Sequence, residues 1–380
     1  MKLSNTLPCP NRTSVGENRV VIGVLTGEGI GPEVVPLALS LLERIADATG
    51  LELELRHGGL IGKPAIEMHG TSLSNEVIDF SEQVFADGGA LFCGAGGDRF
   101  VYDLRARFDL FCKFTPLRPH PPLRDCGAVR PDRLEAVDII AVRENTGGLY
   151  LGEWSRQDSA EFGRVAHHGF GYRESQVARI VDVSARLAAE RRGLVTMTTK
   201  PGGVPSISAL WREIAHERCD GAGVRLEELE IDNAVYQLIA DPRRFDVIVS
   251  PNMFGDVIAD CGALLLGSRG MSYSGNFSPD GHGVFQTGHG AAHDLAGSDR
   301  ANPVGQMLAL AMMLRESFAL DAPAAAIEAA VEEVLARGLR TPDVAGPGSR
   351  VVGTREFGRH VCDALSDGLS NRRATTHRAA

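Results

Sequence analysis

Two acidic residues four positions apart are the most informative chemical feature of the chain. Asp256 and Asp260 follow the apolar run Phe245–Val249. If a helix begins near Phe254, both carboxylates lie on one face of that helix and repel each other. Carboxylate oxygens are hard ligands, so the pair favours Mg²⁺ or Mn²⁺ between them. The ordinary alternative is a helix face exposed to solvent, but the residues around the two aspartates are apolar. Asp232 is a candidate third ligand for the cation.

Arginines suited to binding carboxylates occur at two places. Arg143 directly follows the apolar run Val137–Val142, and Arg105 lies just ahead of Phe108. A guanidinium group binds a carboxylate through two parallel hydrogen bonds. Both residues are therefore candidate substrate ligands, although an arginine without a pocket around it is uninformative.

Two further residues have the chemistry to move protons. Tyr150 follows a glycine pair, a context that exposes its hydroxyl, and Lys200 follows the strand-like run Leu194–Thr198. A lysine removed from water has a lowered pKa and can then transfer protons. Taken singly, each residue is more often structural than catalytic.

These residues stand on an alternation of expected strands and helices. Strands are predicted at residues 19–26, 51–56, 90–94, 137–142, 194–198 and 245–249, and helices at 32–49, 74–85, 172–192, 204–216, 304–318 and 322–337. The pattern predicts an α/β fold with a largely parallel, twisted sheet and flanking helices. Ligands of such sheets bind beyond the carboxyl ends of the strands. The Gly- and Ser-rich segment 262–290 is expected to be a long functional loop, and the residues before 19 and from 369 onward are expected to be tails.

The composition excludes several classes of protein. The 380 residues carry a net charge of −10, and 6% are aromatic. Nucleic-acid binding needs a cationic surface, and a membrane span needs about 18–20 apolar residues, so neither partner is expected. The seven cysteines are scattered without a CxxC pair. They predict reduced thiols in a cytoplasmic protein.

A glycine cluster follows the first predicted strand. Residues 27–33 read GEGIGPE, with a proline suited to the first turn of a helix. The spacing is GxGxG rather than the GxGxxG of a dinucleotide fingerprint. A tight turn and a ligand-binding loop both remain open from this segment alone.

Together, these segments resemble those of the metal-dependent β-decarboxylating dehydrogenases, the family of isopropylmalate, isocitrate and tartrate dehydrogenases. The resemblance covers residues 20–363 and rests on GEGIGPE, LRxxFDLF, VRENTGGLYLGE, VTMTTK, IDNAVYQL, FDVIVSPNMFGDVIAD, GHGAAHDLAGSDRANP and AMMLRESF. It implies an isopropylmalate dehydrogenase-like fold of two domains with the active site in the cleft between them. Residues 1–115 and 268–380 would form the cofactor-side domain. Residues 116–267 would form a central domain that carries the dimer interface and the metal-binding aspartates.

The resemblance also implies a reaction and its residues. A malate-like 2-hydroxy acid would be oxidised at C2 and would then lose its C3 carboxylate. Asp256 and Asp260 would hold the metal ion, with Asp232 reaching in from a second subunit. Lys200, likewise from the partner, would transfer the hydroxyl proton, and Tyr150 would protonate the enol. A homodimer with shared active sites is therefore expected.

The cofactor follows from a second loop. The run HGAAHDLAG resembles the adenosine-binding loop of the family and ends at Asn302. Asp294 would accept hydrogen bonds from the ribose and repel a 2′-phosphate, and NADP-dependent relatives tend to carry a lysine–tyrosine pair at positions 294–295. NAD is therefore expected, held by His289, Gly290, Ala292, Asp294, Leu295 and Asn302.

The substrate segment departs from the family pattern. An ungapped match puts Thr115 in place of a second carboxylate-binding arginine, with Lys113 two residues earlier on the same side of a strand. A match with a small insertion would use Arg118 instead. Arg99, Tyr102 and Lys113 suit a polar or anionic C3 substituent, such as a carboxylate or phosphonate, better than an isopropyl group.

Other readings of the same residues remain open. Isopropylmalate- or tartrate-type activity lies within the same class. A non-catalytic regulatory subunit would be expected to lack Tyr150, Lys200 or one of the three aspartates, and all five are present. A non-oxidative metal-binding lyase would not need Asp294.

Overall fold

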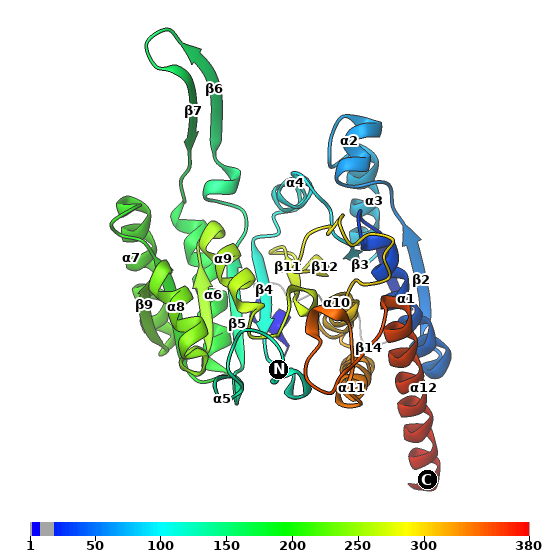
Figure 1. Ribbon diagram of the computed structural model, residues 1–380. Coiled ribbons are helices and arrows are strands. Elements are labelled where there is room, and N and C mark those ends of the chain that lie inside the picture. The colour runs from blue at the N-terminus through cyan, green and yellow to red at the C-terminus, as the bar shows by residue number, and fades with distance from the viewer. Residues whose placement is uncertain (1, 8–18, 380) are drawn as a thin grey trace.

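The computed structural model describes residues 2–7 and 19–379, and one ten-stranded sheet runs through it (Figure 1). The strand order is β2-β1-β3-β12-β11-β4-β5-β10-β8-β9. The strands are β1 Arg19–Leu25, β2 Glu52–His57, β3 Ala90–Cys93, β4 Cys112–Leu117, β5 Ile139–Glu144, β8 Leu194–Thr199, β9 Arg225–Glu230, β10 Val247–Ser250, β11 Tyr273–Phe277 and β12 Gly283–Thr287. A hairpin of β6 Glu153–Ser159 and β7 Gly163–Gly169 projects from the sheet, and β13 Leu339–Arg340 pairs with β14 Arg350–Val351.

Most neighbouring strands run parallel, as the alternation of strands and helices predicts. The exceptions are at the centre, where β4 pairs antiparallel with β5 and β11, and β11 pairs antiparallel with β12. We refer to β2, β1, β3, β12 and β11 with their helices and α4 as the terminal half. The central half comprises β4, β5, β10, β8 and β9 with their helices and the hairpin. Figure 1 shows the two halves side by side.

Helices cover both faces of the sheet. They are α1 Gly31–Thr49, α2 Lys63–His69, α3 Asn75–Ala86, α4 Phe100–Arg107, α5 Pro131–Leu134, α6 Glu174–Ala189, α7 Pro205–Ala222, α8 Ile231–Ala240, α9 Asn252–Gly262, α10 Val304–Glu316, α11 Asp321–Ala336 and α12 Thr354–Ala379. Single 3-10 turns are η1 Leu3–Thr6, η2 Pro121–Leu123, η3 Leu149–Leu151, η4 Pro242–Arg244, η5 Arg269–Met271 and η6 Pro342–Val344. Within the described part of the chain, no helix combines the length and apolar character needed to cross a membrane.

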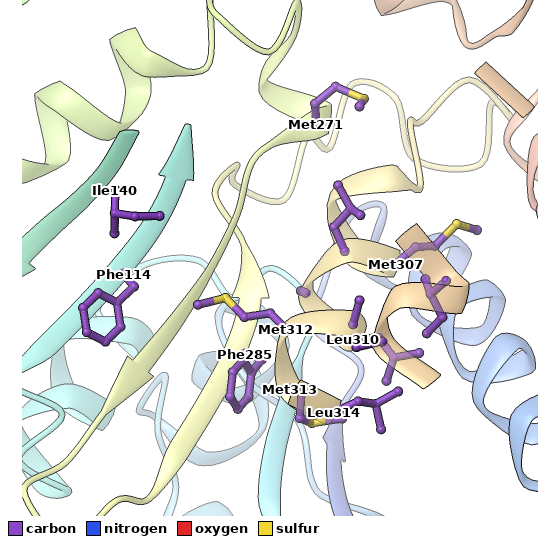
Figure 2. Close-up of a cluster of buried hydrophobic side chains, with 14 of the residues drawn as sticks. Phe114, Ile140, Met271, Phe285, Met307, Leu310, Met312, Met313 and Leu314 are labelled. Carbon is purple, nitrogen blue, oxygen red and sulfur yellow. The ribbon is translucent and has the colours of Figure 1, made fainter. Parts of the chain in front are cut away.

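Burial on both faces explains the composition of the inner elements. All residues of β5 and β10 are buried, so these strands are apolar apart from their last residues. Helix α10 is buried around nearly its whole circumference, where Met307, Leu310 and Met312 pack near Phe114 of β4 and Phe285 of β12 (Figure 2). This core joins the central half to the terminal half.

Three sequence expectations are wrong. Residues 262–290 are not one long loop, because β11 and β12 lie within them and occupy the middle of the sheet. The chain from Leu369 is helical rather than an irregular tail, since α12 continues to Ala379. At the other end Leu3–Thr6 forms a turn with Ser4 and Thr6 buried, and the rest of the expected tail, residues 8–18, lies outside the described residues.

Candidate active site

Asp256 and Arg143 meet at the carboxyl ends of two neighbouring strands. Strand β5 ends one residue after Arg143, and α9 begins two residues after β10, which brings Asp256 over the end of the sheet. Arg143 forms an ion pair with Asp256 and donates from Nε and Nη2 to Asn252 Oδ1 at 3.1 and 2.8 Å. A Cβ at Gly255 would lie 2.7 Å from the Arg143 side chain, so glycine permits this close packing.

Tyr150 belongs to the same group of side chains. Its hydroxyl donates to Asp256 Oδ2 at 3.1 Å. Burial and the negative charge of Asp256 raise the pKa of Tyr150 to about 12, which keeps the phenol protonated. Burial alone would raise the pKa of Asp256, but Arg143 and Lys113 outweigh it, and the pKa is lowered. A protonated phenol beside an ionised carboxylate results, so Tyr150 holds a proton at neutral pH.

Lys113, rather than Arg118, lies beside this group. Lys113 is the register partner of Arg143 on β4, and its side chain is buried. Burial, with the charges of Arg105 and Arg143, lowers the pKa of Lys113 to about 7. Arg118 instead lines a separate cavity of about 800 Å³ with Tyr273. The location of Lys113 therefore favours the ungapped match with the family, and the choice between the two matches stays a prediction.

Arg105 and Thr115 are also buried. Arg105 lies in α4, and burial together with Arg143 lowers the pKa of its guanidinium to about 9. Thr115 stands two residues after Lys113 on β4, opposite Ala141 of β5, and therefore faces the same side of the sheet. The structure thus brings Arg105, Lys113 and Arg143 together near one carboxylate.

Arg99 lies at the edge of this group. It directly precedes α4, and its guanidinium carbon is 5.6 Å from the centre of the Tyr102 ring and 4.7 Å from that of Trp154. The Tyr102 ring is 5.1 Å from the Tyr150 ring. Arg99 is therefore linked to the site by Tyr102, which lies between Arg99 and Tyr150. The Tyr102 and Trp154 rings both pack beside the Arg99 guanidinium.

The remaining acids and the lysine form separate groups in a single chain. Asp260 lies one turn after Asp256 on α9, and Arg269 donates to it at 3.1 Å. Lys200 Nζ is 2.8 Å from both Asp232 and Glu230, and these groups are partly exposed. Among residues 2–7 and 19–379, no group of three His, Cys, Asp or Glu side chains is placed to hold a metal ion.

The six residues expected to bind the cofactor line one cavity. Its volume is about 390 Å³, and its walls include His289, Gly290, Ala292, Asp294, Leu295 and Asn302. Burial lowers the pKa of His289, whose Nε2 is buried without a hydrogen-bond partner in the described protein, while its Nδ1 is 2.9 Å from the Gly290 carbonyl. A buried ring nitrogen without a protein partner, on a residue that lines the cavity, fits a site that binds a polar ligand.

The early glycine cluster supports this cavity. Ile30 is part of the cavity wall, and its amide donates to the Ala291 carbonyl at 2.9 Å. Gly29 has φ +60°, and a Cβ there would lie 1.9 Å from the Ala291 oxygen. Residues 27–33 therefore form a tight turn that packs against the loop expected to bind the cofactor, and ligand binding by the turn itself stays a prediction.

The chemistry of the acids also fits a divalent cation. Asp256 and Asp260 present oxygen ligands from successive turns of α9, and Asp256 keeps about a third of its side chain exposed. Two carboxylates leave coordination positions for a substrate and for a further acid. Asp232 fits that role if a second chain supplies it.

Sequence reasoning missed several residues that support the site. Asn252 orients Arg143, Glu230 bonds to Lys200, and Asp343 accepts from Asn302 Nδ2 at 3.0 Å. Their partners lie 30 or more residues away in the sequence, so no local pattern signals them. Asn252 had one available signal, because it follows the same buried strand, β10, that precedes the paired aspartates.

Comparison of the sequence with known proteins identifies the family of the chain. The family model described as isocitrate/isopropylmalate dehydrogenase matches residues 21–361. The chain is 37% identical to a 3-isopropylmalate dehydrogenase of Desulfotalea psychrophila over 90% of this chain and 99% of the relative. It is 38% identical to the 3-isopropylmalate dehydrogenase of a Synechococcus species over 91% of this chain and 93% of the relative.

Solved structures agree with the sequence matches. The isocitrate dehydrogenase of Methylococcus capsulatus superimposes with a TM-score of 0.81 at 29% identity, covering 91% of this chain and 99% of that one. The TT0538 protein of Thermus thermophilus has a TM-score of 0.79 at 27% identity, over 91% of this chain and 68% of that one. The chain is a decarboxylating dehydrogenase and belongs to the isocitrate/isopropylmalate dehydrogenase family.

Proposed function

We propose that the protein uses NAD and a divalent cation to oxidise and decarboxylate a 3-substituted malate whose C3 substituent is anionic, such as a carboxylate or phosphonate. The observation that carries this proposal is Lys113, which is buried beside Arg105 and Arg143. Arg143 is already paired with Asp256, which leaves Arg105 and Lys113, with Arg99 beyond Tyr102, as basic groups for the substrate. A third negative group on the substrate would balance them.

The proton steps fall to two residues. Tyr150 keeps its proton at neutral pH and would deliver it to C3 after carbon dioxide leaves. Lys200 would accept the proton of the C2 hydroxyl. A divalent cation held by Asp256, Asp260 and Asp232 would supply Lewis-acid stabilisation of negative charge on oxygen.

A homodimer would complete each site. Lys200 and Asp232 are bonded to each other and partly exposed, so one chain presents them as a unit to a second chain. The proposal keeps the division expected from the sequence, into residues 1–115 with 268–380 and residues 116–267, and places the interface on the latter. A cytoplasmic location, expected from the cysteine pattern, stays a prediction.

NAD is the proposed electron acceptor. Asp294 and Leu295 line the 390 Å³ cavity where an adenosine ribose would bind. A carboxylate at position 294 accepts hydrogen bonds from ribose hydroxyls and repels a 2′-phosphate. Arg300 lines the same cavity, so the preference for NAD over NADP needs a direct measurement.

Isopropylmalate dehydrogenase activity is the second candidate. Relatives carrying that name are 36 to 38% identical over about nine-tenths of the chain. A regulatory subunit has less support, since Tyr150, Lys200 and the three aspartates are all retained. Tartrate-type activity would use the same five residues and stays a rival within the class.

A substrate panel separates these candidates. Purified enzyme with Mg²⁺ and NAD is given malates with carboxylate, phosphonomethyl, isopropyl or hydroxyl substituents at C3, and NADH and carbon dioxide are measured. We expect the highest kcat/KM with an anionic substituent. A highest kcat/KM with 3-isopropylmalate would reject the anionic pocket and leave the second candidate.

A further inference from the structure

Arg99 and Trp154 join the two halves of the protein next to the substrate site. Arg99 precedes α4 in the terminal half, and Trp154 is the second residue of β6 in the central half. The guanidinium carbon lies 4.7 Å from the centre of the indole, within the range of a cation–π interaction. The residues are far apart in sequence, so this contact exists only in the folded protein.

Trp154 is itself held in place. Its ring stacks on His168 of β7, with centres 5.6 Å apart and planes inclined by 25°. His168 Nε2 is 2.6 Å from the Leu149 carbonyl, which belongs to the residue before Tyr150. The indole orientation is thereby tied to the segment that carries the proposed proton donor.

Arg99 has free donors despite these contacts. Its Nε is 3.3 Å from Asp103 Oδ1, and its guanidinium lies over the Tyr102 ring. In the described part of the chain, no hydrogen bond is recorded from its two terminal nitrogens. Aromatic faces fix the plane of a guanidinium and leave its edge open for an anion.

Tyr102 connects Arg99 to the substrate site. The Tyr102 ring contacts Arg99, is 5.8 Å from the guanidinium carbon of Arg105, and packs against Tyr150. A substrate bound beside Arg105 and Tyr150 would therefore lie next to Tyr102, and a C3 substituent that extends along this ring would reach the Arg99 guanidinium.

We propose that Trp154 is a positioning residue for substrate specificity, which holds the Arg99 guanidinium so that its terminal N–H groups bind the anionic C3 substituent. This inference rests on the proposed function, because it assigns a residue to the anionic end of that substrate. Trp154 acts through Arg99 and is not itself a substrate ligand.

The test measures how Trp154 affects discrimination between substrates. Kinetic constants are measured for W154A, W154F and R99Q with the best anionic substrate and with 3-isopropylmalate. We expect W154A to lower the ratio of the two kcat/KM values about fivefold to tenfold, through a higher KM for the anionic substrate. W154F retains an aromatic face and should restore most of the ratio.

Matched variants separate this effect from general damage. F162A removes an exposed aromatic ring from the tip of the same hairpin and should leave the ratio unchanged. The double variant W154A/R99Q should have the same ratio of kcat/KM values as R99Q alone, because each change removes the same interaction between Arg99 and Trp154. If wild type prefers an anionic substrate but W154A keeps the wild-type ratio, the role of Trp154 is rejected and the proposed function stands. If wild type prefers 3-isopropylmalate, the proposed function fails first, and this inference fails with it.

Discussion

The Tyr150 hydroxyl and the Asp256 carboxylate share a hydrogen bond of 3.1 Å. Asp256 also pairs with Arg143, which is fixed by Asn252. The proposed proton donor is therefore positioned by the residue expected to hold the metal ion. Asp256 would therefore couple proton donation by Tyr150 to binding of the cation.

Removing this hydroxyl should slow the reaction without abolishing binding. We expect Y150F to lower kcat at least about a hundredfold, in the range typical of a lost general acid. Substrate affinity, measured by isothermal titration calorimetry with Mg²⁺ present, should change by less than about threefold. Y273F is the matched control, because Tyr273 lines the separate 800 Å³ cavity. A Y150F enzyme with wild-type kcat would remove Tyr150 from the mechanism.

Lys113 should make substrate affinity depend on pH. Its pKa is lowered to about 7 because the group is buried near Arg105 and Arg143, so it is charged below that pH and increasingly neutral above it. KM for the anionic substrate should therefore rise as the pH increases from about 6 to 8. K113R keeps its charge and should flatten this rise, whereas K113M should raise KM about tenfold at pH 6. A bound anion would raise the pKa of Lys113. The midpoint of the rise in KM should therefore lie at a higher pH than the pKa of Lys113 in the free enzyme. A K113M enzyme with an unchanged KM profile would show that the lysine does not contact substrate.

Shared active sites predict that two inactive chains rescue each other. K200A and D256N homodimers should each be inactive, because each lacks one part of every site. In a mixed dimer, one site receives the intact Lys200 of one chain and the intact Asp256 of the other. Random pairing makes half of all dimers mixed, with one of two sites complete, so about a quarter of wild-type activity should return. The measurement is NADH production after co-refolding of the two chains at equal concentration. No recovery in verified mixed dimers would mean that each site is built from one chain.

The positions of the candidate metal ligands and proton donor were predictable because their signals are local or carried by motifs. Asp256 follows a buried strand, and the four-residue spacing put Asp260 on the same helix face. The position of Lys113 could also be predicted, since side chains alternate along a strand. The alternative Arg118 could be set aside only in the folded chain, where it lies in another cavity.

Other features had no local signal. Strands β11 and β12 contain Gly275, Gly283 and polar residues rather than a β-branched run, so their sequence is typical of a loop. They become strands because neighbours on both sides provide hydrogen-bond partners, and Asn276 is satisfied by Asn145 at 3.0 Å. The contact between Arg99 and Trp154 depends likewise on tertiary structure.

The N-terminal turn η1 should contribute to stability although it lies outside the residues matched by the family model. Ser4 donates its amide to Glu316 Oε2 of α10 at 2.8 Å, and Arg186 of α6 donates to the Thr6 carbonyl at 2.8 Å. Leu7 is buried in the main core. The turn therefore contacts helices of both halves, and Glu316 is a buried carboxylate whose recorded hydrogen bonds come from this turn.

Truncating the buried leucine tests that contribution. We expect L7A to lower the free energy of unfolding by about 2 kcal/mol, at the low end for a buried leucine because a chain end relaxes easily. R186A, which loses one partly buried hydrogen bond, should cost about 1 kcal/mol. L60A serves as the control, since Leu60 is 46% exposed, and it should be close to neutral. Denaturant unfolding followed by circular dichroism measures all three variants. An L7A protein as stable as L60A would mean that the turn is not held against α6 and α10 in solution, whatever the activity of the enzyme.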